Sequence, residues 1–159
     1  MAPPPLSPSL LREPVHLLAT GFGAGLVPRA PGTAGSVLAL APAWLMFDLP
    51  FAWRAAVALA VVVLAVWVCG ESTRRLAVHD HPAIVLDEIA AMLLLSLLIE
   101  PSVPWLLAAL VLFRVFDIAK PWPIRVVDRA VSGGLGIVLD DVLAALFAAV
   151  CLVAVDAVV

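Results

Sequence analysis

The chain has 159 residues, of which 64% are hydrophobic and 13% are charged, and its formal net charge is −3. A soluble domain carries roughly 25% charged residues, so this composition excludes an ordinary water-soluble domain and predicts an integral membrane protein. The small negative charge also argues against a nucleic-acid partner.

The first segment, residues 1–14, is rich in proline and serine. It lacks the order of a cleavable signal peptide, in which basic residues precede an apolar stretch. We predict a short disordered tail there. Residues 15–159 then form a single membrane-embedded domain.

Apolar runs follow at 37–47, 55–70, 89–99, 103–113 and 142–155. Each is shorter than the ~20 residues that cross a bilayer comfortably. With their acidic ends included, the last three extend over 83–99, 103–119 and 137–157 and reach the spanning range. Pro42 predicts a kink or a break in the first run. We therefore predict an all-α polytopic membrane bundle of about five helices, with cytoplasmic loops and short interfacial helices.

The connections between these helices predict an orientation. Pro50, and later Pro101 with Pro104, mark tight turns on one side, whereas the segments 21–35, 72–82 and 121–136 lie on the other. The side with the long segments holds Arg12, Arg29, Arg74, Arg75, Arg114, Lys120, Arg125 and Arg129, and the opposite side holds Arg54. Because basic loops stay in the cytoplasm, we expect the long segments to face it.

Three acidic groups border the apolar runs on that same side: Asp87 with Glu88, Asp117, and Asp140 with Asp141. An isolated carboxylate beside a long apolar run is costly. Five converging carboxylates are explained most simply by a divalent cation. Carboxylate oxygens without nearby thiolates suit Mg²⁺, or Mn²⁺ or Ca²⁺, better than zinc.

Each group taken alone also has a structural interpretation. The two acidic pairs sit where we expect helices to start, and negative charge is favourable at a helix N-terminus. Asp117 lies near the end of its helix, where it could form an ion pair with Arg114 three residues earlier. Two acidic pairs at matched depth favour the metal interpretation of the whole pattern.

A glycine-rich segment at 21–36 contains Pro-Gly-Thr-Ala-Gly-Ser before the first apolar run. Its amides and hydroxyls could hold a phosphate at a helix start, although N-capping by Thr33 or Ser36 is the alternative. The candidate phosphate-binding residues are Gly32, Thr33, Ser36, Arg114, Lys120 and Arg125. For His79-Asp80-His81 we expect solvated loop residues or headgroup contacts rather than zinc ligands.

Four stretches of the sequence resemble the phosphatidylglycerophosphatase A family: HLLATGFGAGLVPRAPGTAGS, VHDHPAIVLDEIAAM, FRVFDIAKPWPIRVVDR and GGLGIVLDDVLA. They occur in the family's order and with similar spacing. The resemblance implies a multi-pass enzyme of the bacterial inner membrane that requires Mg²⁺. Such an enzyme converts phosphatidylglycerophosphate into phosphatidylglycerol by removing its terminal phosphate. The family's motifs map onto Asp87, Glu88, Asp117, Asp140 and Asp141, onto Pro31, Gly32, Thr33, Gly35 and Ser36, and onto Arg114 and Lys120.

The resulting hypothesis is metal-assisted hydrolysis at the cytoplasmic face. Asp87 and Asp140, with Asp141 or Asp117, would hold one or two Mg²⁺. Glu88 is the first choice for positioning or deprotonating water, and an aspartate nucleophile is the alternative. A phosphatidyltransferase acting on CDP-alcohols is disfavoured because its longer aspartate motif is absent. A small divalent-cation transporter or channel is the alternative function, and the sequence predicts no particular oligomeric state.

Overall fold

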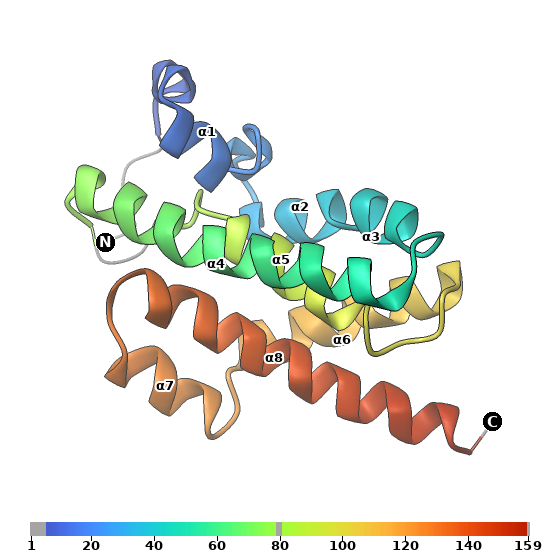
Figure 1. The fold of residues 1–159 in the computed structure, drawn as a ribbon. Coiled ribbons are helices and arrows are strands. Elements are labelled where there is room, and N and C mark those ends of the chain that lie inside the picture. Colours follow the sequence, from blue (N-terminus) through green and yellow to red (C-terminus); the bar gives the residue numbers. More distant parts are fainter. Residues whose placement is uncertain (1–5, 79–80, 159) are drawn as a thin grey trace.

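The computed structural model describes residues 6–78 and 81–158, which form helices and loops without a strand (Figure 1). The predicted all-α class is confirmed. In chain order the helices are η1 (Pro8–Arg12), α1 (Pro14–Ala19), η2 (Ala24–Leu26), α2 (Pro31–Leu38), α3 (Leu40–Met46), α4 (Phe51–Leu76), α5 (Leu86–Leu95), α6 (Val103–Ala119), α7 (Ile124–Ala130) and α8 (Gly133–Asp156).

Within the described residues, α4 and α8 are the two helices that are long and apolar enough to cross a membrane. They run side by side in Figure 1, and α8 also packs against α5, α6 and α7. Helix α8 therefore forms the centre of the bundle. The prediction of five spanning helices is not confirmed, since α5 has 10 residues and α6 has 17.

The apolar run at 37–47 is divided between α2 and α3, and the break lies at Ala39. Pro42 accounts for this break. It has no N–H to donate to the carbonyl of Leu38, and its ring crowds the preceding turn. The kink or break predicted at Pro42 is therefore confirmed.

Glycines allow α4 and α8 to approach each other closely. A Cβ atom added at Gly134 would lie 2.8 Å from the backbone nitrogen of Gly70. Gly133 has φ +75°, which turns the chain into α8. The helix thus begins at Gly133 rather than at the predicted residue 137, because a glycine-rich sequence that looked like a loop packs as helix.

The predicted disordered tail differs from the structure in its second part. Pro8–Arg12 forms the short helix η1, and α1 follows directly and packs on α4. His16 Nδ1 lies 2.9 Å from the hydroxyl of Ser72, and Arg75 pairs with Glu13 at 3.1 Å. These contacts hold α1 against α4. The domain boundary at residue 15 stays a prediction.

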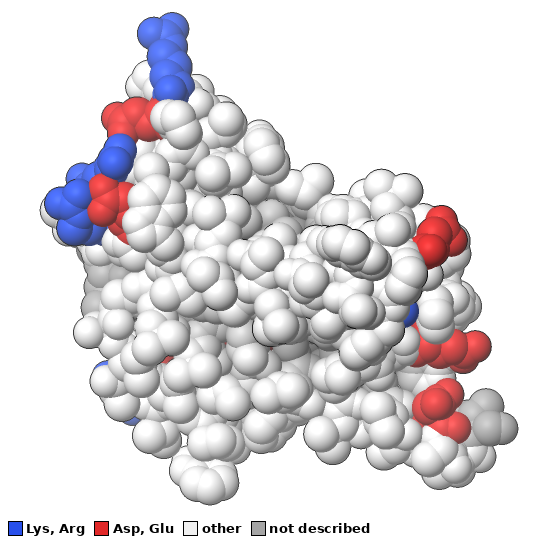
Figure 2. Space-filling model, viewed as in Figure 1, with Lys and Arg blue, Asp and Glu red and all other residues white. Residues whose placement is uncertain are grey.

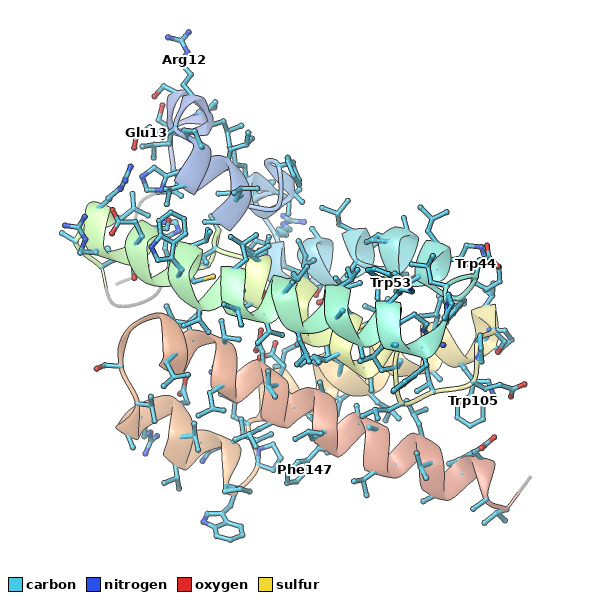
Figure 3. The ribbon with its side chains drawn as sticks, in the orientation of Figure 1. Arg12, Glu13, Trp44, Trp53, Trp105 and Phe147 are labelled. Carbon is cyan, nitrogen blue, oxygen red and sulfur yellow. The ribbon has the colours of Figure 1, made fainter. Side chains whose placement is uncertain are left out.

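On the face drawn in Figure 2, the exposed charged residues gather near the two ends of the molecule. The face in Figure 2 has a broad uncharged surface, with basic and acidic groups together at one end and acidic groups at the other. Trp44, Trp53 and Trp105 lie toward the end opposite Arg12 and Glu13 (Figure 3). An uncharged surface with tryptophans toward one border is typical of a protein in a bilayer.

Candidate active site

A small polar cavity lies where the start of α5, the end of α6 and the first half of α8 meet, and α7 closes one side. Its volume is about 120 Å³. The charged and histidine side chains that line it are His81, Asp87, Glu88, Asp117, Lys120, Asp128, Asp140 and Asp141. The structure thus brings all five carboxylates predicted from the sequence into one cavity.

These carboxylates form two groups that share Asp141. One group joins Asp141 to Asp87 and Glu88, and the other joins it to Asp117 and Asp140. In each group, one oxygen atom from each of the three carboxylates lies within 4.8 Å of the other two. Asp141 is almost fully buried, with 3% of its surface exposed. A side chain in this position could supply a ligand oxygen to a metal ion held by either group.

The position of the carboxylates within their helices bears differently on the two acidic pairs. Asp87 and Glu88 occupy the first turn of α5, where the helix dipole favours negative charge. Asp140 and Asp141, in contrast, lie well inside α8, because that helix begins at Gly133. The prediction that they start the last helix is wrong, and favourable charge at an N-terminus does not explain them.

Two cationic side chains connect the carboxylates. Arg114 lies 2.7 Å from Asp117 and 3.4 Å from Glu88, so the ion pair that the structural interpretation of Asp117 predicts is present. Lys120 lies 2.6 Å from Asp128 and 2.5 Å from Asp140. Partial burial lowers the pKa of Lys120, but the hydrogen bonds to both aspartates more than offset this and leave the pKa above its ordinary value. Lys120 therefore stays charged.

Negative charge exceeds positive charge in this cluster. Among the described residues, six carboxylates face the cavity, and Arg114 and Lys120 are the cations that contact them. Glu88 Oε2 and Asp141 Oδ2 are buried and have no hydrogen-bond partner within the described structure. Buried anionic oxygens without donors are costly. This donor set fits a hard divalent cation.

The predicted phosphate-binding segment lies beside the cluster. A Cβ atom at Gly32 would overlap Glu88 Oε1 and lie 2.8 Å from a guanidinium nitrogen of Arg114, so this glycine makes room for their ion pair. Ser36 is buried and its hydroxyl donates to the carbonyl of Gly32 at 2.8 Å. The hydroxyl hydrogen of Ser36 is thus already used inside α2.

Of the six predicted phosphate-binding residues, Lys120 lines the cavity and the other five do not. Thr33 borders a separate apolar groove along α6. Arg125 is exposed on α7 and donates to the carbonyl of Ala119 at 3.4 Å. The cavity lining thus includes Lys120 but neither of these two residues.

Sequence reasoning missed Asp128 and gave His81 no specific role. Asp128 reaches the cavity because the turn after α6 folds α7 back toward α8, and spacing alone does not reveal that fold. His81 is buried, and its Nδ1 accepts a hydrogen bond from the amide of Ala83 at 3.1 Å. The solvated-loop interpretation is therefore wrong for His81, while His79 and Asp80 lie outside the described residues.

Comparisons with known proteins show to which family the chain is similar. The family model described as Phosphatidylglycerophosphatase A matches residues 17–156. Phosphatidylglycerophosphatase A of Escherichia coli strain K12 is 41% identical over 140 residues, covering 87% of this chain and 81% of the relative. The protein of the same name from Haemophilus influenzae is 40% identical over 154 residues, covering 96% and 94%.

A putative phosphatidylinositol-3-phosphatase of Bacteroides thetaiotaomicron is 37% identical over 140 residues, covering 82% of this chain and 86% of the relative. No solved structure matches the chain at a significant level. These matches do not favour the alternative of a cation transporter or channel. The family model and the two relatives at about 40% identity cover most of the chain, and the chain is an enzyme that belongs to the phosphatidylglycerophosphatase A family.

Proposed function

We propose that this enzyme hydrolyses the terminal phosphomonoester of phosphatidylglycerophosphate, with Mg²⁺ as cofactor, at the cytoplasmic face of the bacterial inner membrane. The products are phosphatidylglycerol and inorganic phosphate. The observation that carries the proposal is Asp141, a buried carboxylate shared by two groups of acidic oxygens and bearing an oxygen with no hydrogen-bond partner in the described structure.

The two acidic groups would hold the cation. Asp141 would be the shared ligand, with Asp87 on one side, where Glu88 is the neighbouring carboxylate, and with Asp117 and Asp140 on the other. Bound Mg²⁺ supplies charge neutralisation for the phosphoryl group and acidifies a coordinated water. The excess of carboxylates over cations explains why a phosphate anion would enter this cavity only together with divalent cations.

The chain's own residues then position the reacting groups. Arg114 and Lys120 supply hydrogen-bond donors to phosphate oxygens. Their positions are already fixed by ion pairs, so they need no reorganisation during the reaction. Glu88 Oε2 accepts the proton of the attacking water, since this oxygen is buried and its partner oxygen already faces Arg114. The water oxygen bonds to phosphorus, the bond to the lipid oxygen breaks, and that oxygen takes up a proton.

The charge distribution supports the proposed membrane orientation. Arg74 and Arg75 end α4 beside the start of α8, near the half of the bundle that contains the cavity. Arg54, near the other end of α4, is buried and donates to the carbonyl of Ser96 at 2.7 Å. It therefore adds no exposed positive charge there. The exposed basic residues thus follow the positive-inside rule with the cavity facing the cytoplasm.

The substrate is tested by phosphate release from three lipids in matched detergent micelles. These are phosphatidylglycerophosphate, phosphatidylinositol 3-phosphate and phosphatidic acid, each supplied with Mg²⁺. We expect the highest kcat/KM for phosphatidylglycerophosphate. A higher kcat/KM for the inositol lipid would contradict the proposed substrate and agree with the name of the Bacteroides relative.

The direct attack of water is tested in ¹⁸O-labelled water. The labelled oxygen should appear in the released phosphate and not in the phosphatidylglycerol, which shows that the bond to phosphorus breaks. Because a covalent route would label the phosphate in the same way, the distinguishing result is that rapid acid quenching traps no phosphoenzyme. A phosphoaspartate on Asp87, Asp117 or Asp140 would overturn direct attack and establish the nucleophile alternative.

A further inference from the structure

An apolar groove of about 550 Å³ runs along the outer side of α6, next to α2. Its lining consists of Thr33, Leu110, Val111, Arg114, Val115, Ile118 and Ala119. The α6 residues recur at intervals that place them on one face of the helix. Over these ten positions the face extends about 13 Å along the axis.

The side chains on this face are unusually open. Val111 is 61% exposed, Val115 is 52% exposed and Ile118 is 72% exposed. Helix α6 packs against α8, and that contact leaves these three side chains exposed. Apolar side chains in this position need a hydrophobic partner outside the described chain.

Arg114 distinguishes this groove from the remaining apolar surface. It lines the groove, and its guanidinium pairs with Glu88 and Asp117 of the carboxylate cavity. The same side chain thus lies between the apolar groove and the polar cavity. A ligand that touches both must carry a hydrocarbon part and an anionic part a short distance apart.

We propose that one acyl chain of the lipid substrate lies in this groove, so that Val111, Val115 and Ile118 bind the chain while the headgroup passes Arg114 into the cavity. The inference rests on the proposed function. Charge complementarity favours a phospholipid occupant, because its phosphate would meet the Arg114 guanidinium, which lines the apolar groove and pairs with two carboxylates of the cavity. The groove would therefore hold the substrate in place during the reaction.

The test compares two substrates that share one headgroup. One is long-chain phosphatidylglycerophosphate, and the other is its deacylated, water-soluble headgroup. Val115→Trp fills the groove, and Val111→Trp fills it one turn away. Val63→Trp is the matched control, since Val63 is 71% exposed on α4 and does not line the groove. Thermal unfolding of each variant confirms that it is folded.

We expect both groove variants to lower kcat/KM for the lipid about tenfold through loss of buried chain contacts. Activity on the free headgroup should stay as in the wild type, and Val63→Trp should change neither. Equal effects on lipid and headgroup, or no difference from Val63→Trp, would overturn the inference. The groove would then be a surface that contacts bulk lipid and not the substrate. A wild type that releases no phosphate from either substrate would instead refute the proposed function, and the inference with it.

Discussion

Replacing Gly32 by alanine separates the geometry of the site from the stability of the fold. The added Cβ would overlap Glu88 Oε1 and lie 2.8 and 3.0 Å from the two terminal nitrogens of Arg114. Both are ends of flexible side chains, so they can move by about 1 Å at little cost in folding free energy. A displacement of that size in a catalytic group can lower the rate about a hundredfold.

Gly35→Ala is the matched control on the same helix. Its Cβ would lie 2.6 Å from Cβ of Val85 and 3.1 Å from the Val85 carbonyl oxygen, and that residue is fully buried. Overpacking there should cost about 1–3 kcal/mol of folding free energy. Gly32→Ala should therefore lose activity and keep its thermal midpoint, whereas Gly35→Ala should lose stability and keep kcat while folded.

The assay is steady-state phosphate release together with thermal unfolding of the same samples. If Gly32 acted through its backbone amide alone, alanine would preserve that amide and the activity with it. Wild-type kcat in Gly32→Ala, or a larger fall in thermal midpoint than in Gly35→Ala, would show that Gly32 does not set the positions of Glu88 and Arg114.

Three further predictions concern the remaining charged groups and the cofactor. Lys120→Met should lower kcat/KM about a hundredfold, because the cation between Asp128 and Asp140 is lost, and steady-state kinetics should show partial recovery in Lys120→Arg. Arg54→Met leaves the Ser96 carbonyl unpaired and should cost about 1–3 kcal/mol of folding free energy in thermal unfolding; a fall in kcat at permissive temperature would contradict this purely structural role. Mg²⁺ at a hundred times its dissociation constant should stabilise the wild type by about 2.7 kcal/mol, measured as a higher thermal midpoint that a chelator reverses.

The sequence was sufficient to predict the ends of a helix where the start and stop signals lie next to those ends in the chain. The predicted span 103–119 coincides with α6, Val103–Ala119, because Ser102 caps its start and Pro121 follows soon after its end. The start of α8 was missed by contrast. Gly133 and Gly134 disfavour helix by propensity, and the close approach of Gly70 that stabilises them there is a tertiary contact.

In the site, too, local features were predicted and tertiary contacts were not. The five carboxylates were predicted from their cost beside apolar runs, which is a local property. The role of Gly32 against Glu88 and the arrival of Asp128 depend on how α2 and α7 pack, and no spacing in the chain encodes those contacts. The division of the acidic residues into two groups around Asp141 likewise required the fold.

In the mechanism that we propose, buried carboxylates around Asp141 support Mg²⁺-dependent hydrolysis of a lipid phosphate. The most direct measurement is phosphate release from phosphatidylglycerophosphate, with Mg²⁺ and then with EDTA, for the wild type, Asp141→Asn and Asp156→Asn. Asp156 is the control because it is an exposed aspartate at the far end of the same helix. We predict release by the wild type and Asp156→Asn that EDTA abolishes, and none above background by folded Asp141→Asn. Release that persists in EDTA, or in folded Asp141→Asn, would contradict the account.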